Sequence, residues 1–276
     1  MNLQNTAGTS VNTLVASLWR NRQLIARMSK REVVGRYRGS ILGLAWSFFN
    51  PVLMLAVYTF FFSVIFKARW SGLDGADKGS FATLVFVGMI VHGLFAECVN
   101  KAPTLIVNNV SYVKKVVFPL EILPWISLGS AMFHMAISLA VLVLARILLG
   151  GTLSWTIFFF PLVLLPLVLV TIGFSWFFAA VGVYLRDVVQ TVGIFTTVLT
   201  FLSPVFYPIS ALPERYHFWF KLNPLTFIIE ESRNVLIWNH APDWTNLGLM
   251  VVAAGLIAWL GFWVFQKCRE GFADVV

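Results

Sequence analysis

The chain has 276 residues, of which 59% are hydrophobic, 16% aromatic and only 12% charged, and its mean hydropathy is +0.82. A soluble globular protein carries roughly 25% charged residues, so this chain cannot cover its own surface in water. Its net charge of +8 does not indicate nucleic-acid binding, because no recognisable nucleic-acid-binding fold accompanies the charge.

The first feature along the chain is a basic stretch before the first long apolar run. It holds seven of the 20 basic residues, namely Arg20, Arg22, Arg27, Lys30, Arg31, Arg36 and Arg38. Such a cluster marks the cytoplasmic side of a membrane protein and is attracted to anionic lipid headgroups. In residues 11–33, apolar side chains fall near one helical face and basic or polar ones mostly on the other, which predicts an amphipathic helix lying in the membrane plane. An ordinary soluble amphipathic helix is the alternative.

Six apolar runs follow that are long enough for transmembrane helices, which need about 20 residues to cross roughly 30 Å of hydrocarbon. They cover residues 41–66, 81–107, 122–149, 155–185, 188–207 and 245–265. The sequence therefore predicts an all-α integral membrane protein, with one membrane domain over residues 1–276. An even number of spans puts both termini on one side, and the basic residues favour the cytoplasm, although the first outer loop carries three bases.

Between the fifth and sixth runs, residues 213–238 contain two apolar pieces separated by Asn223 and Pro224. The longer piece would form a helix of about 21 Å, too short to cross the membrane. The region also carries Glu230, Glu231 and Arg233, yet it is too apolar for a solvated loop. We expect a re-entrant pair of half-helices in the outer leaflet. A seventh, charged span is the alternative.

Ionisable side chains inside spans are functional candidates, because burying charge in lipid costs several kcal/mol. Glu97 and Lys101 stand four apart, the favourable orientation for an ion pair within one helix. This pair either neutralises itself or, through Glu97, contributes to a transport pathway. His92 and His134 have no second ligand at metal spacing, so we expect packing roles and no metal site.

Hydroxyl groups form a stripe along the fifth run at Thr196, Thr200, Ser203 and Tyr207, in steps of four, three and four residues. Small polar residues often hold helices together. Alternatively, the stripe lines a lumen and makes weak hydrogen bonds to a passing substrate. Among the many aromatic residues, Tyr58, Phe206 and Tyr207 are our candidates for a channel wall.

Three stretches carry a family resemblance. The first is RYRGSILGLAW at residues 36–46; the second is KKVVFPLEILP at residues 114–124; the third comprises RDV at 186–188, SPVFYP at 203–208, NPL at 223–225 and Arg233. In this order and spacing, from about residue 20 to its end, the chain resembles the permease family of type-2 ABC transporters that export O-antigen, capsule and teichoic-acid polymers.

The resemblance implies a homodimer that encloses a channel for a lipid-linked polysaccharide in the bacterial inner membrane. Two copies of a separate nucleotide-binding ATPase would dock on its cytoplasmic face. Residues 108–118 would form the coupling helix. The residues expected to contact the ATPase are Arg36, Arg38, Tyr112, Lys114 and Lys115, although membrane anchoring alone also explains the basic ones.

The chain contains no G-x-x-x-x-G-K-[ST] motif, so it has no P-loop with which to bind ATP. We expect ATP and Mg²⁺ to be bound by the partner, with no cofactor and no enzymatic activity in this chain. A permease for a small lipid or drug is the main alternative. The scattered carboxylates and histidines argue against an intramembrane enzyme, and the absence of an internal repeat argues against a secondary transporter.

Overall fold

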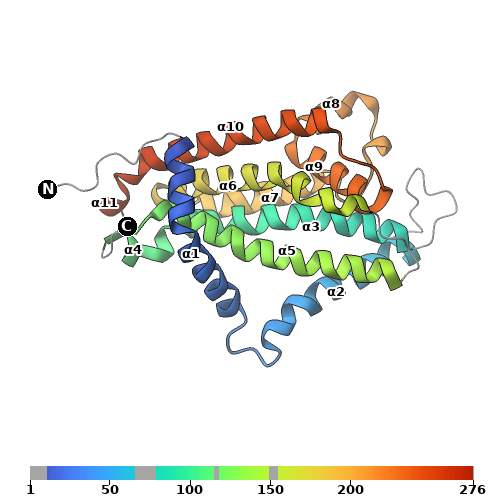
Figure 1. Ribbon diagram of the computed structural model, residues 1–276, viewed down its shortest axis with the longest axis horizontal. Helices are drawn as coiled ribbons and strands as arrows, with labels where there is room; N and C mark the ends of the chain where they lie inside the picture. The colour runs from blue at the N-terminus through green and yellow to red at the C-terminus, as the bar shows by residue number, and fades with distance from the viewer. Residues whose placement is uncertain (1–10, 66–78, 115–117, 149–154, 276) are drawn as a thin grey trace.

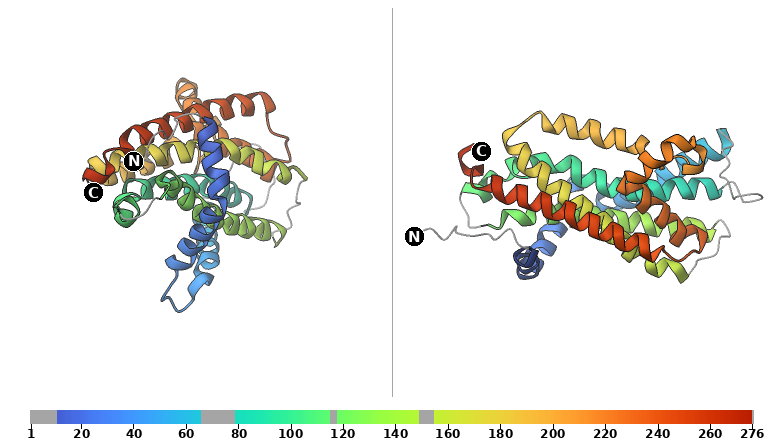
Figure 2. Two further views of the ribbon diagram at one scale, coloured as in Figure 1. Left: turned by 60° about the vertical axis from the view of Figure 1, so that its left-hand side comes forward. Right: turned by 90° about the horizontal axis from the view of Figure 1, so that it is seen from above.

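A computed structural model of the chain describes residues 11–65, 79–114, 118–148 and 155–275. These residues form helices and turns with no β-strand, which confirms the all-α prediction. Long helices run side by side along the molecule, whereas α1 (Val11–Arg36) crosses them near one end (Figures 1 and 2).

Five helical stretches in the described residues are long and apolar enough to cross a membrane: Gly43–Phe61, Phe81–Thr104, Leu120–Leu148, Trp155–Tyr184 and Trp244–Arg269. Their main helices are α2 (Trp46–Tyr58), α3 (Gly79–Lys101), α5 (Leu123–Leu148), α6 (Phe160–Tyr184) and α10 (Trp244–Arg269). Short helical segments extend them: η1 (Gly43–Ala45), η2 (Thr59–Ile65), η3 (Ala102–Thr104), η5 (Leu120–Ile122) and η6 (Trp155–Phe159). The chain is therefore a multi-pass membrane protein.

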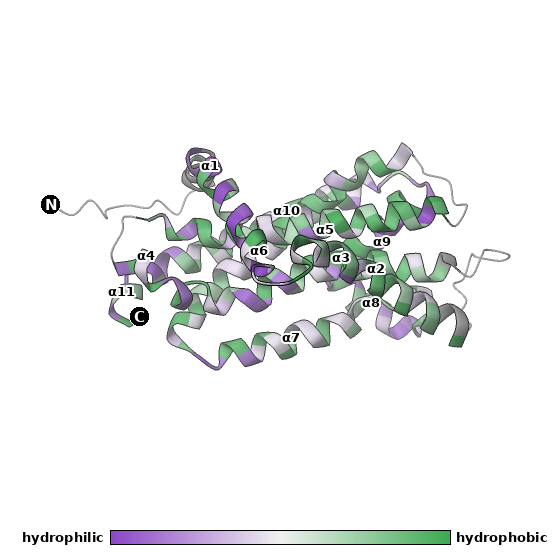
Figure 3. Cartoon of the chain, turned by 90° about the horizontal axis from the view of Figure 1, so that it is seen from below, coloured by the Kyte–Doolittle hydropathy of each residue, from purple (hydrophilic) through white to green (hydrophobic). Residues whose placement is uncertain are grey.

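The fifth predicted span differs from the structure. The helix there, α7 (Val188–Leu202), has 15 residues and is about 22 Å long, less than the roughly 30 Å of a lipid core. It ends because Ser203, directly before Pro204, takes an extended conformation with φ −113° and ψ 150°. The helical span predicted through residue 207 thus stops five residues earlier. α7 runs lengthwise along the bundle and contacts α3 (Figure 3).

Residues 213–238 form two short helices, α8 (Glu214–Leu222) and α9 (Pro224–Arg233), and a π-helical extension, η8 (Asn234–Trp238). Asn223 separates the two helices and accepts a hydrogen bond from the Leu225 amide at 3.0 Å, which caps α9. α9 is largely buried, whereas no residue of α8 is. Both helices lie at the end of the bundle opposite α1 (Figure 1).

The other end of the bundle holds α1 together with two short helices, α4 (Val110–Lys114) and α11 (Phe272–Val275), as Figure 1 shows. A further turn, η4 (Val107–Asn109), leads into α4. Polar residues gather in this region, whereas the long helices are largely hydrophobic (Figure 3).

The core of the bundle depends on close approach of helix backbones. α6 and α10 have the most extensive contact among the described elements. At their crossing, Gly173 and Gly261 meet so closely that a Cβ atom on Gly261 would overlap the carbonyl oxygen of Gly173. Small residues at such crossings increase van der Waals contact, which is the main attraction between helices in lipid.

Large apolar side chains cover the outside of the bundle. On α2 they include Phe48, Phe49 and Leu53, and on α7 they include Ile194 and Phe201. An apolar surface of this extent would promote aggregation in water. Lipid or another membrane-embedded protein surface therefore surrounds these helices.

Candidate functional site

Two ion pairs join α1 to α3. Arg36 donates to Glu97 at 2.6 Å, and Lys101 donates to Glu32 in a second short contact. The predicted pairing of Glu97 with Lys101 inside one helix is therefore wrong. Each side chain has a closer partner of opposite charge on α1, a helix more than 60 residues away in sequence.

His134, on α5, joins the first of these ion pairs. Its Nδ1 lies 3.1 Å from Glu97 Oε1 and 3.0 Å from Arg36 Nη1, and its Nε2 lies 3.2 Å from the Tyr37 hydroxyl. No sequence pattern indicated this carboxylate contact, because the partners come from separate elements. The cluster ties α1, α3 and α5 together. The described residues contain no group of three side chains able to hold a metal ion.

Glu121 contacts side chains that lie near opposite ends of the sequence. One carboxylate oxygen accepts from the Ser17 hydroxyl at 3.0 Å, and the other accepts from Arg269 at 3.0 Å. Its backbone carbonyl accepts from the Trp176 indole, also at 3.0 Å. Glu121 thereby fixes α1, α6 and α10 around the turn that precedes α5. The motif at residues 114–124 contains Glu121, but sequence reasoning assigned it no role.

The hydroxyl stripe of α7 faces α3 and α9 within the chain. The Thr196 hydroxyl donates to Asn100 at 2.8 Å, and the Thr200 hydroxyl lies 3.2 Å from His92 Nε2. Ser203, fully buried, accepts from the Asn223 amide at 2.9 Å. In a single chain, these three hydroxyls therefore bond to neighbouring elements, as small polar residues commonly do in membranes.

The predicted channel aromatics come from two places. Phe206 and Tyr207 are half-buried just beyond α7, where the Tyr207 hydroxyl donates to the Phe201 carbonyl and its ring contacts that of Phe220. Tyr58 is half-buried at the end of α2 and packs against the core. Tyr207 thus lies beside α8, while Tyr58 belongs to a separate helix.

Arg233 is the most deeply buried ion-pair residue among those described, with 1% of its surface exposed. Its guanidinium donates to the carbonyls of Leu84 at 3.1 Å and Val205 at 2.9 Å, and to Glu230 at 3.0 Å. A Cβ at Gly88 would lie 3.1 Å from this guanidinium, so the glycine leaves room for it. Arg233 therefore fastens α9 to α3 and to the segment after α7.

The predicted ATPase-docking residues fall into two groups. Tyr112 and Lys114 lie on α4, where the Tyr112 ring stacks on Phe118 with centroids 4.5 Å apart. Tyr112 is partly exposed and Lys114 is exposed. Arg38 is exposed beyond α1, on the segment that leads to α2, whereas Arg36 is held by Glu97. Lys115 lies outside the described residues, so the predicted coupling helix at 108–118 is seen only in part.

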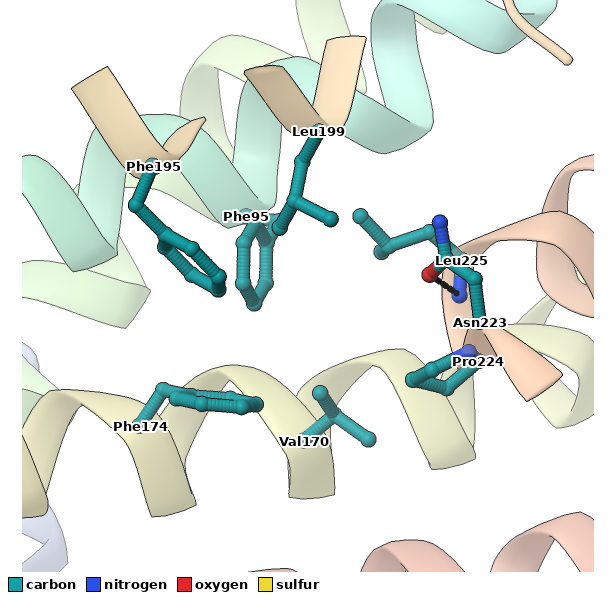
Figure 4. A pocket seen from close by; sticks show the side chains of 8 residues that line it. All are labelled: Phe95, Val170, Phe174, Phe195, Leu199, Asn223, Pro224 and Leu225. Carbon is teal, nitrogen blue, oxygen red and sulfur yellow. Dashed lines mark hydrogen bonds between the residues drawn. The ribbon is translucent and has the colours of Figure 1, made fainter. Parts of the chain in front are cut away.

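A small apolar cavity of about 180 Å³ lies between α3, α6, α7 and the α8–α9 turn (Figure 4). Phenyl rings of Phe95, Phe174 and Phe195 line it, together with Val170, Leu199, Asn223, Pro224 and Leu225. Asn223, the one polar side chain among these eight, donates its amide to Leu202 and Ser203. The cavity thus offers mainly hydrocarbon packing.

Comparison with known proteins places the chain in a family. The family described as ABC-2 type transporter matches residues 23–237, which is most of the chain. The chain therefore belongs to the ABC-2 type transporter family, whose members are membrane transporters, and the predicted family resemblance is confirmed.

Three individual relatives are similar to this chain over most of their length. The chain is 26% identical over 265 residues to the O-antigen export system permease protein RfbA of Myxococcus xanthus, covering 95% of this chain and 99% of that protein. It is 23% identical over 255 residues to a protein of the same name from Klebsiella pneumoniae, covering 92% and 95%. It is 21% identical over 245 residues to the polysialic acid transport protein KpsM of Escherichia coli, covering 87% and 91%.

Proposed function

We propose that this chain is the channel-forming permease subunit of an ATP-driven exporter that moves lipid-linked polysaccharide, similar to O-antigen, across the bacterial inner membrane. The observation that carries the proposal is its nearly full-length similarity to permeases named for O-antigen export. The relative named for polysialic acid transport also favours a glycan polymer over a small lipid or drug.

The proposal includes six membrane crossings, with α7 as the fifth. α7 is about 22 Å long, shorter than a lipid core of about 30 Å, and the chain turns directly after it at residues 203–205. A helix shorter than the lipid core can still cross it, because the bilayer thins locally around the helix. Six crossings put both termini on one side. The basic residues of α1 and the last turn of α10, which holds Lys267 and Arg269, support a cytoplasmic location.

Two copies of the chain would enclose the channel. Thr200, Phe206 and Tyr207 keep part of their surface accessible on α7 and just beyond it, and Tyr58 does so on α2. These four side chains are our candidates for direct contact with the glycan. Thr196 and Ser203 are hydrogen-bonded to neighbouring elements, and Glu97 is ion-paired. These three residues would support the channel wall without contacting the glycan. Many weak contacts suit a polymer that must slide.

The ATPase would dock at the end of the bundle that holds α1, α4 and α11. α4 is short, exposed at Ser111, and braced by the stacked rings of Tyr112 and Phe118. These features support α4 as the coupling helix. Two copies of the ATPase, which would bind ATP and Mg²⁺, are then needed for one permease dimer.

Deletion of this gene tests the proposed function. Polysaccharide would be labelled on intact cells and on cells opened by lysis. The proposal predicts polymer trapped inside, with the surface coat restored by a plasmid copy of the gene. A normal surface coat in the deletion strain would overturn the glycan assignment and favour a small-lipid or drug exporter.

A further inference from the structure

The chain directly after α10 is anchored inside the fold. After α10, the chain turns at Gly271 and inserts Phe272 into the core, where its side chain has 0% exposure. The Phe272 ring lies with its centroid 5.5 Å from that of Phe265 and 6.3 Å from that of Tyr184. The Tyr184 hydroxyl donates to the Cys268 carbonyl at 2.8 Å, which fixes the turn to α6.

This C-terminal segment, residues 269–275, touches the coupling region from both sides. On one side of residues 115–117, α11 packs against α4, and the two helices lie together in Figures 1 and 3. On the other side, Arg269 donates to Glu121 at 3.0 Å, three residues beyond Phe118. The segment therefore contacts, on both sides, the part of the chain on which an ATPase would act.

The chain just before the coupling region is held by α6. Gly182 lies so close to Pro103, in η3, that a Cβ on the glycine would overlap the proline backbone. α6 in turn packs along α10 through Gly173 and Gly261. A displacement of α4 thus reaches the α6–α10 pair by two routes, one through η3 and one through the C-terminal segment.

We propose that Arg269 and Phe272 are positioning residues for energy coupling: they hold α4 to the α6–α10 pair, so that movement of the ATPase is passed to the membrane helices. This inference rests on the proposed function, because it requires an ATPase partner at α4. Without the contacts of Arg269 and Phe272, α4 would move with the ATPase, but α6 and α10 would not follow. ATP would then be hydrolysed without matching export.

Three variants and one control test this role. Phe272→Ala removes the buried ring, Phe272→Leu restores apolar volume, and Arg269→Gln removes the ion pair while leaving the Phe272 anchor in place. Val275→Ala is the control, because Val275 lies on the same short helix and is half exposed. Each is expressed with the chain's own ATPase in the deletion strain. ATP hydrolysis is measured on the purified complex, and export is measured as surface polysaccharide per unit of complex in the membrane.

We expect Phe272→Ala and Arg269→Gln to lower export per ATP hydrolysed by about tenfold, a size typical of residues that couple two sites. Phe272→Leu should recover most of that ratio, and Val275→Ala should leave it unchanged. An unchanged export-to-ATP ratio in both Phe272→Ala and Arg269→Gln would overturn the inference. Failure of the unaltered chain to restore surface polysaccharide would instead overturn the proposed function, so the two failures are distinguishable.

Discussion

The guanidinium of Arg36 lies 2.6 Å from the carboxylate of Glu97, and this contact joins the crossing helix α1 to the bundle. Four residues earlier on α1, Glu32 meets Lys101, which stands four residues later on α3. The order of the partners is therefore reversed between the two helices. Two ion pairs one helical turn apart therefore resist both sliding and rotation of α1 on α3.

Reversing the charge of either Glu97 or Arg36 alone should destabilise the protein. Glu97→Arg would bring two guanidinium groups together and leave His134 without its carboxylate. We expect a loss of about 1–3 kcal/mol, since hydrogen bonds to charged groups contribute about that much. The double variant Arg36→Glu with Glu97→Arg should recover at least half of the loss in the thermal unfolding midpoint of the purified protein. No recovery would mean that the pair does not interact in solution.

Replacement of Arg233 should be more damaging than that of any exposed arginine. Arg233→Gln removes two hydrogen bonds to buried carbonyls and leaves Glu230 without its cation. We expect a cost of about 3–5 kcal/mol, the range for breaking a buried charge contact. Arg215→Gln on α8 is the matched control, because Arg215 is exposed. Equal yields of folded protein from the two variants would contradict the anchoring role of Arg233.

The crossing of α6 and α10 should tolerate no side chain at Gly261. Gly261→Ala forces the helices apart, and overpacking of this kind typically costs about 1–3 kcal/mol. Gly255→Ala, on the same helix, should be neutral or slightly stabilising, because no atom outside the local helix backbone lies within 4 Å of the position that its new methyl group would take. The thermal unfolding midpoints of the two variants check this. A fall of equal size in both would show that the close crossing does not set the effect.

Channel residues should be reachable from outside during transport. We expect Thr200→Cys and Tyr207→Cys to react with a membrane-impermeant maleimide, and polymer in transit should slow that reaction. The experiment uses a Cys268→Ser background, since Cys268 is partly exposed while Cys98 is buried. Val183→Cys, at a buried position of α6, is the control for non-specific labelling. If polymer in transit does not change the reaction rates, neither residue lines the channel.

The course of the long helices could be predicted from sequence, because apolar runs of sufficient length have few alternatives in a membrane. The end of α7 could not be predicted as well. Residues 203–207 are apolar enough to extend a span. Hydropathy gives no indication that Ser203 takes an extended conformation before Pro204. A short helix followed by an apolar turn has nearly the same hydropathy as a longer helix.

Ion-pair partners were predicted poorly, for a physical reason. Spacing along one helix placed Glu97 beside Lys101, but α1 brings Arg36 and Glu32 closer to each of them. Glu121, Arg269 and Phe272 likewise acquire partners only when distant parts of the chain meet. Local periodicity contains no information about such neighbours. The spacing of the predicted hydroxyl stripe, by contrast, correctly put Thr196 and Thr200 on one face of α7, whereas Ser203 and Tyr207 lie beyond the end of that helix.

Glycan export by this chain can be measured directly with the permease and its ATPase in inside-out membrane vesicles supplied with lipid-linked polysaccharide. Movement into the vesicle lumen protects the polymer from an added glycan-degrading enzyme. We expect protection that requires ATP and both proteins, and that is lost when the ATPase is inactivated by mutation. Polymer that stays fully digestible while ATP is hydrolysed, with a small lipid or drug accumulating in its place, would show that the chain does not export a glycan.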